Sequence, residues 1–322
     1  MNELALAAFA AETGEHVVGE PRGRRFERFE RDFDTRAYRS RLAERGFRFV
    51  PRSSSEFPRS LAAIFYPPVG LFVRGAADLA MLERPAVALV GARSCSSYGA
   101  QVARMLGREL AAAGLVVVSG MARGIDGEAH RGALEAGGAT VAVLGCGVDR
   151  DYPASNAELA RRIAGSGLIV SEYAPGVEPA PWRFPARNRI VAGLSQAAVV
   201  VEARERSGAL ITADLALEEG REVFAVPGEI TSSLSAGTNA LLRHGATAAT
   251  CAADVLESFG LGAPEAPAPP AEAAPILERL PATADELVRA LRMDAGALAA
   301  LLMELELSGL VSEAEGVYRC LR

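Results

Sequence analysis

The sequence predicts an α/β fold: a large domain with a doubly wound, mostly parallel sheet, followed by a small C-terminal winged-helix domain. Short apolar runs alternate with stretches of helical length between residues 86 and 226. A Pro- and Ala-rich stretch then separates these runs from the last part of the chain. A length of 322 residues suits one large domain and one smaller one.

The predicted strands are short, Val-rich apolar runs, each followed by a Gly-rich turn. They span residues 87–90, 115–118, 140–144, 168–170, 197–201 and 223–226. Continuous apolarity of this kind is typical of strands that are buried on both faces. The segments between them, such as 101–113 and 128–136, have helical length and spacing, which predicts a parallel, doubly wound sheet. Ligands of such sheets bind at the carboxyl ends of the strands.

An Arg-rich segment, residues 1–50, precedes the sheet domain, which we expect over 51–262. Residues 21–52 contain 11 Arg and five acidic residues, a net charge of +6, so the rest of the chain carries −12. This excludes a uniformly basic nucleic-acid binder but leaves room for a local basic site. Because charge runs are usually solvated, a solvated helical lead-in or a partly disordered arm is favoured over a dedicated binding arm.

The C-terminal part begins with a Pro/Ala linker at residues 263–275, which is expected to be stiff and extended. Residues 276–322 then contain two short helices, at 283–291 and 294–307, and a hairpin at 310–321. This is the pattern of a helix-turn-helix with a wing. A sequence-specific repressor is disfavoured, because the second helix has no Arg, Asn or Gln to reach base edges.

Several function classes are excluded by residues that the chain lacks. It has no Lys, which excludes a P-loop and Schiff-base chemistry. Its four Cys and three His are widely spaced, so neither a metal nor another cofactor is expected. No apolar stretch reaches the ~18 residues of a membrane span. The N-terminus has no signal pattern, so we expect a cytoplasmic protein with no membrane contact.

Three successive strand ends are rich in Gly and small residues, which favours one phosphate-lined crevice. The first ends in Gly91-Ala92-Arg93, where backbone N–H groups and a guanidinium would suit an anion. A simple tight turn with Ser caps is the alternative. The second ends in Ser119-Gly120, where a dinucleotide site would have an acid for the ribose, so NAD is disfavoured. The third ends in Gly145-Cys146-Gly147 and leads to Tyr152-Pro153.

The stretch 182–189 combines two aromatic residues with three Arg and one Asn at a predicted helix start. Aromatic rings can stack on bases while Arg neutralises phosphates. An amphipathic helix start is an equal alternative, with Phe184 in the core and with Arg187 and Arg189 in salt bridges. A further helix opens at Ser207-Gly208, and Glu202 before it is interpreted as structural or paired with Arg. Asp126 is a plausible helix N-cap and His130 a packed residue.

Taken in order, these motifs resemble the DNA-processing protein A (DprA/Smf) family over about residues 57–246. The segments that carry the resemblance are Gly91-Ala92-Arg93 with Tyr98-Gly99, residues 119–126 with Ala129-His130, Asp149 with Tyr152-Pro153, residues 184–190 with 192–195, Ser207-Gly208 with 210–213, residues 224–228, and Gly237 with Asn239. The resemblance implies an extended Rossmann core that binds single-stranded DNA. It also implies loading of the RecA recombinase during natural transformation, with homodimers as the working form.

Carried over by position, the resemblance implies a DNA-binding site with no catalytic residue. Its members would be Gly91, Ala92, Arg93, Ser119, Gly120, Phe184, Arg187, Asn188, Ser207 and Gly208. Ala92 stands where the family usually has Ser or Thr, which removes a hydroxyl but keeps a backbone N–H. The family's N-terminal helical domain is not convincingly present in residues 1–50.

The expected function is therefore single-stranded DNA binding, without catalysis. The enzyme alternative is a nucleoside-monophosphate phosphoribohydrolase of the same broad fold. Those enzymes carry a PGGxGT-type loop with a nearby Glu, whereas Pro227-Gly228 is followed here by Glu229-Ile230.

Overall fold

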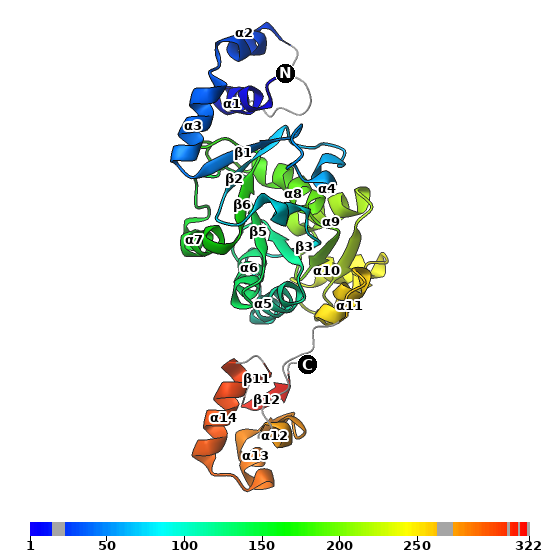
Figure 1. The fold of residues 1–322 in the computed structure, drawn as a ribbon. Coiled ribbons are helices and arrows are strands. Elements are labelled where there is room, and N and C mark those ends of the chain that lie inside the picture. The colour runs from blue at the N-terminus through cyan, green and yellow to red at the C-terminus, as the bar shows by residue number, and fades with distance from the viewer. Residues whose placement is uncertain (15–22, 263–272, 308–309, 315, 321–322) are drawn as a thin grey trace. The chain divides into compact units, whose positions relative to one another are not determined.

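The computed structural model describes residues 1–14, 23–262, 273–307, 310–314 and 316–320. The chain divides into two compact units, residues 1–263 and 264–322, which are described separately below. Within the described residues, no helix combines the length and the apolarity that crossing a membrane would require. The fold is α/β, as predicted, with a mostly parallel central sheet (Figure 1).

The sheet of the first unit has nine strands in the order β1-β2-β6-β5-β4-β3-β7-β8-β9. The seven strands from β6 to the β9 edge, in the order β6-β5-β4-β3-β7-β8-β9, pair in parallel. Strand β2 pairs antiparallel with both β1 and β6. The bounds are β1 Phe47–Pro51, β2 Gly70–Arg74, β3 Ala86–Val90, β4 Val116–Ser119, β5 Thr140–Val143, β6 Leu168–Ser171, β7 Ala197–Val200, β8 Glu222–Ala225 and β9 Thr247–Ala248.

Helices cover both faces of this sheet (Figure 1). Val87 and Leu89 of β3 face a cluster formed with α5, α6 and α11, while Ala88 and Val90 face a cluster formed with α8 and α9. Alternation along one strand thus buries both of its faces. The helices of this unit are α1 Glu3–Thr13, α2 Arg24–Asp32, α3 Thr35–Glu44, α4 Arg59–Ala62, α5 Ser97–Ala112, α6 Ile125–Glu135, α7 Ala157–Ser166, α8 Arg183–Gly193, α9 Gly208–Glu218, α10 Ala236–Arg243 and α11 Ala252–Ser258, with short 3-10 turns at Leu79–Glu83 and Ala154–Asn156.

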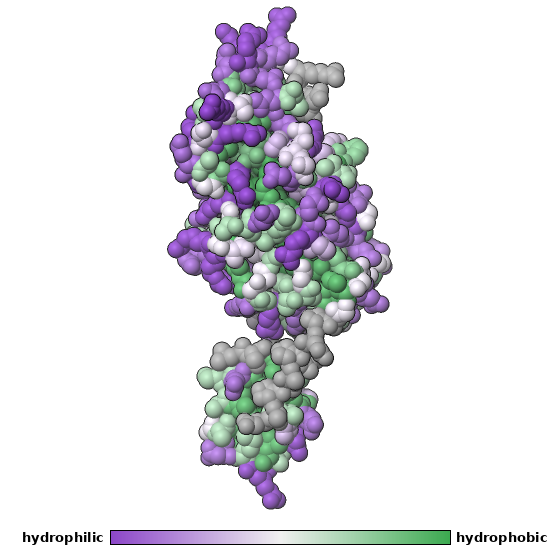
Figure 2. Space-filling model, viewed as in Figure 1, coloured by the Kyte–Doolittle hydropathy of each residue, from purple (hydrophilic) through white to green (hydrophobic). Residues whose placement is uncertain are grey.

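The N-terminal helices pack more closely than the sequence indicated. In α1, Leu4 and Leu6 are at most 1% exposed, and the Phe9 ring lies 5.5 Å from that of Phe26 in α2. The expectation of a solvated lead-in or a partly disordered arm is therefore wrong for α1, because its Leu, Ala and Phe side chains fill clusters that the charge count could not reveal. The Arg side chains of α2 and α3 stay exposed, and Figure 2 shows hydrophilic residues over these helices.

The second unit has its own core and the arrangement of a winged helix. Residue Thr283 caps α13 in a capping box with Glu286, and Asp294 accepts hydrogen bonds from the backbone at the start of α14. Leu298, Leu302 and neighbouring side chains form the core. Most of the predicted linker, 263–272, lies outside the described residues. The elements are α12 Ala274–Leu277, β10 Ala282–Thr283, α13 Ala284–Leu291, α14 Ala295–Leu307, β11 Val311–Ala314 and β12 Val317–Cys320, with sheet order β10-β12-β11.

Candidate nucleic-acid interface

A crevice lies at the carboxyl edge of the parallel strands, where the sequence predicted a binding site. It consists of two adjoining cavities of about 290 and 210 Å³. Five residues line both cavities: Arg93, Gly120, Ala122, Phe184 and Arg187. The larger cavity is further lined by Arg123, Leu144, Gly145, Cys146, Tyr152, Pro153 and Ser155, and the smaller one by Val90, Gly91, Asp126, Pro185, Asn188, Val191, Ser207, Gly208, Ala209 and Thr212.

A buried arginine forms part of the crevice wall. Arg187 is 4% exposed, and its Nη1 donates a hydrogen bond of 2.7 Å to the carbonyl oxygen of Val143. A Cβ on Gly120 would lie 2.0 Å from the same Nη1, so the guanidinium occupies the space that a side chain at this position would need. Its Nε has no hydrogen-bond partner among the described residues. This wall therefore carries a fixed positive charge with one donor unused.

Asp126, which also lines the crevice, carries a charge opposite to that of Arg187. Its buried carboxylate accepts a hydrogen bond from the backbone N–H of Ala122. Burial raises the pKa of Asp126, and the charge of Arg187 opposes that shift. Burial lowers the pKa of Arg187, because it disfavours the charged guanidinium, and the charge of Asp126 opposes that shift. The predicted N-cap role is wrong, because Gly124 occupies the N-cap of α6 and Asp126 lies inside the first turn.

Aromatic and cationic groups form the rim of the crevice. The guanidinium carbon of Arg93 lies 5.1 Å from the centre of the Phe184 ring. The Tyr152 ring lies 5.5 Å from that of Phe184, with 23° between the planes, so the two are stacked. A Cβ on Gly145 would lie 2.9 Å from the Phe184 ring. Phe184 is therefore a half-buried rim residue rather than a core residue, with an exposed Arg and an exposed Tyr beside it.

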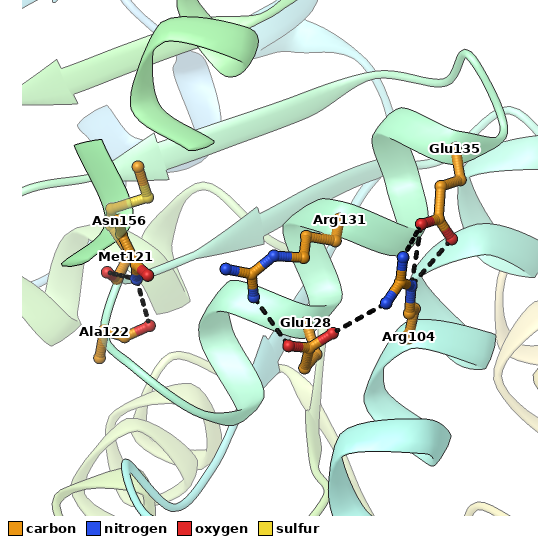
Figure 3. A network of polar contacts seen from close by, with 7 residues as sticks. All are labelled: Arg104, Met121, Ala122, Glu128, Arg131, Glu135 and Asn156. Carbon is orange, nitrogen blue, oxygen red and sulfur yellow. Dashed lines mark hydrogen bonds and ion pairs between the residues drawn. The ribbon is translucent and has the colours of Figure 1, made fainter. Parts of the chain in front are cut away.

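The side chain of Asn156 holds the turn after β4 (Figure 3). Its Nδ2 donates hydrogen bonds of 3.0 and 3.1 Å to the carbonyl oxygens of Met121 and Ala122. Met121 has φ of +62°, a left-handed conformation that is uncommon outside glycine. The two hydrogen bonds thus stabilise a strained turn that places Ala122 and Arg123 in the crevice lining.

Ion pairs behind this turn join α5 to α6 (Figure 3). Glu128 accepts from Arg131 at 2.7 Å and lies 3.7 Å from Arg104, which also binds Glu135. These side chains are partly exposed, so each pair alone contributes little, and their value lies in the connected network.

Eight of the ten predicted site residues line the crevice, and Ala92 and Ser119 do not. Ser119 is fully buried, and its hydroxyl donates to the carbonyl oxygen of Leu89 at 2.6 Å. The backbone N–H of Ala92, which we expected to be available to a phosphate, donates instead to the carbonyl oxygen of Glu202 at 2.8 Å. Both groups serve the packing of the turns.

The remaining predicted residues take defined places. Asn188 donates from Nδ2 to the carbonyl oxygen of Gly208, which ties α8 to the start of α9. Ser207 is the N-cap of α9. Glu202 is structural, as interpreted, because its buried carboxylate accepts from the backbone and hydroxyl of Ser96. Arg189 forms the predicted kind of salt bridge, with Glu172.

One rim residue, Tyr152, was not among the predicted site residues. The sequence offered a signal in Tyr152-Pro153, which follows a Gly-rich strand end. Nothing in the local pattern indicates that this ring stacks on Phe184, since Tyr152 lies in the loop after β5 and Phe184 in the first turn of α8.

His130 provides a pH-dependent measure of stability. It is fully buried, and its Nδ1 lies 2.7 Å from the Thr140 hydroxyl. Burial, with smaller contributions from Arg187 and Arg131, lowers its pKa from 6.5 to about 3. Between these values the unfolded chain binds the proton and the folded chain does not. Its contribution to stability is therefore complete above pH 6.5 and is lost as the pH falls.

We expect the free energy of unfolding to fall by up to about 1.4 kcal/mol per pH unit below pH 6.5 because of this residue. Urea titrations at several pH values check this against His130→Gln, which can still hydrogen-bond Thr140 but does not titrate. The two proteins should differ in slope over this range, and identical slopes would contradict the assignment.

Comparisons with known proteins agree with this architecture. The family described as DNA recombination-mediator protein A matches residues 48–260, and the DprA winged helix domain matches residues 262–316. The DNA processing protein DprA of Streptococcus pneumoniae is 47% identical over 203 residues, which is 63% of this chain and 71% of that protein. Protein Smf of Escherichia coli is 39% identical over 298 residues, 87% of this chain and 79% of that protein.

Two solved structures extend the comparison. The X-ray structure of DprA from S. pneumoniae has a TM-score of 0.68 at 38% identity, covering 79% of this chain and 91% of that one. The DprA structure from Helicobacter pylori, described as showing a single-stranded DNA binding mode, has a TM-score of 0.60 at 32% identity, covering 66% and 95%. The resemblance found in the sequence is thereby confirmed, and the chain belongs to the DNA recombination-mediator protein A family, that of DprA and Smf.

Proposed function

We propose that the chain binds single-stranded DNA in the crevice at the carboxyl edge of its sheet. The observation that carries the proposal is the rim, where Arg93 and Tyr152 flank Phe184 beside the buried cation of Arg187. Rings provide surfaces on which unpaired bases stack, and guanidinium groups bind phosphates. A narrow crevice of this size takes exposed bases and backbone, which a stacked duplex does not present.

The biological role that we propose is protection of incoming DNA and loading of the RecA recombinase. The chain would act in natural transformation and DNA recombination, in the cytoplasm and as a homodimer. Family membership supports this proposal. RecA loading is tested by the rate at which RecA filaments form on single-stranded DNA, with and without the chain. The homodimer is tested by the mass of the protein in solution.

The DNA-binding proposal is tested by titration with labelled oligonucleotides, single-stranded and duplex, over a range of salt concentrations. If about 3 to 5 phosphates are neutralised, the log–log salt slope should be about −2 to −3.5, from ~0.7 per phosphate on single strands. Equal affinity for both forms would overturn the crevice proposal. Release of free base from nucleoside monophosphates would favour the phosphoribohydrolase alternative instead.

We expect the winged helix to add no DNA affinity. The exposed positions of α14 include Ala299, Ala300, Met303 and Glu304, none of which can donate to a base edge or neutralise a phosphate. Residues 276–322 contain five Arg and eight acids, a net charge of −3. A chain ending at residue 262 should bind single-stranded DNA as tightly as the full chain at low salt. A clear loss of affinity on truncation would contradict this.

A further inference from the structure

The loop between β7 and α9 adjoins the crevice and carries two exposed arginines. The side chains of Arg204 and Arg206 are exposed and form no hydrogen bond or ion pair with any residue that the structure describes. The backbone N–H of Ser207 donates to the carbonyl oxygen of Arg204 at 3.1 Å, which closes a tight turn. Ser207 and Gly208 line the crevice directly. Arg204 and Arg206 therefore lie at most three residues before Ser207, a residue of the crevice wall.

The order of the strands places two further arginines, Arg123 and Arg93, along the same carboxyl edge of the sheet. The sheet runs β5-β4-β3-β7, and neighbouring strands lie about 4.8 Å apart. The loops that follow these strands carry Tyr152, Arg123 and Arg93 before the β7 loop is reached. Arg123 and Arg93 are exposed and line the crevice. Cationic side chains therefore follow one another along the carboxyl edge, from the aromatic rim towards the far side of β7.

The acidic groups nearby are mostly engaged. The carboxylate of Glu202 is buried against Ser96, and that of Asp126 is buried near Arg187. Glu205 is exposed between the two arginines of the loop. Since the chain outside residues 21–52 is strongly acidic, a row of exposed arginines at this edge is a local concentration of positive charge. A row of cations suits a polyanion with regularly repeated phosphates.

We infer that Arg204 and Arg206 bind phosphates of single-stranded DNA where the strand leaves the crevice. In this arrangement the DNA strand runs along the carboxyl edge of the sheet, across the ends of β4 and β3, and continues past the end of β7. The aromatic rim holds bases, and the β7 loop adds backbone contacts that do not depend on sequence. This inference rests on the proposed function, and it enlarges the site beyond the residues of the crevice.

The test uses two oligothymidylates of about four and about sixteen nucleotides, the shorter filling the crevice alone. The variants are Arg204→Ala and Arg206→Ala, with Arg243→Ala as the matched control. Arg243 is equally exposed, but it lies in the last turn of α10, which returns to the opposite edge of the sheet before β9. Equal melting temperatures of the four proteins establish that the folds are comparable.

For the long oligonucleotide, each loop variant should lose about two- to fivefold in affinity, as for an exposed ionic contact. Its log–log salt slope should become shallower by about 0.7. The short oligonucleotide should bind all four proteins equally, and Arg243→Ala should match the unmodified chain with both.

Two results would overturn the inference while leaving the proposed function intact. In the first, the unmodified chain binds the short oligonucleotide and binds the long one more tightly, but both loop variants show the same increase in affinity from the short to the long oligonucleotide. In the second, the loop variants lose as much affinity for the short oligonucleotide as for the long one, which would place the arginines inside the crevice. Failure of the unmodified chain to bind either oligonucleotide would instead remove the proposed function itself.

Discussion

Replacing Arg93 with Ala should weaken single-stranded DNA binding by roughly 1.5–3 kcal/mol, the range for a hydrogen bond to a charged group. That is about a tenfold to hundredfold loss of affinity. The salt slope should become shallower by about 0.7, since one phosphate contact disappears. Arg93 is exposed and its described contact is the Phe184 ring, so the melting temperature should not change.

Arg93→Lys is the matched control, because it keeps the charge but removes the planar fork. It should retain the salt slope and lie between the unmodified chain and Arg93→Ala in affinity. Normal binding by Arg93→Ala would mean that the phosphate site lies elsewhere.

Arg187→Ala should behave differently from Arg93→Ala. Arg187 is buried, so its loss removes the hydrogen bond to the Val143 carbonyl and leaves Asp126 without the cation that most favours its charged form. The folded state should lose about 1–3 kcal/mol, the cost of an unsatisfied buried polar group. A lower melting temperature together with weaker binding is the expected result. An unchanged melting temperature would contradict the buried position.

Phe184→Ala should weaken binding by about 1–3 kcal/mol if one base stacks on the ring, which is about five- to 150-fold. The salt slope should not change, because stacking releases no counterions. Oligonucleotide titrations over a salt series measure both quantities.

Phe184→Tyr keeps an aromatic face and should bind like the unmodified chain. Because Phe184 is half-buried against Gly145, Phe184→Ala also removes packing at the rim. Tyr152→Ala separates loss of rim packing from loss of base stacking, since it removes the ring beside Phe184 but leaves Phe184 packed on Gly145. A shallower salt slope in Phe184→Ala would show that Arg93 had also been displaced.

Local pattern was sufficient for the six strands β3 to β8 and for the edge of the sheet at which the crevice lies, but it did not predict β1, β2 and β9. Val-rich runs predicted strands such as β3 and β4, and Gly-rich strand ends such as Gly91 and Gly120 marked the carboxyl edge at which the crevice lies. The physical reason is that burial on both faces and close backbone approach each restrict which residue types can occur.

What the pattern could not supply was the direction in which individual groups point. Ser119 and Ala92 stand at strand ends, yet their polar groups are used by Leu89 and Glu202, which are distant in sequence. The stacking of Tyr152 on Phe184 likewise depends on a loop and a helix start that meet only in the folded chain. The packing of α1 was missed because a net charge describes the surface of a segment and not its buried side.

The residues around the crevice come from loops that the fold must bring together. Arg93 follows β3, Gly120 follows β4 and Phe184 opens α8, and these elements become neighbours only when the parallel sheet is complete. A partly unfolded chain that keeps its helices therefore has no crevice. If the crevice is the DNA site, as proposed, only the folded sheet binds the oligonucleotide, and a saturating oligonucleotide at about 100 times Kd should stabilise the folded chain by about 2.7 kcal/mol.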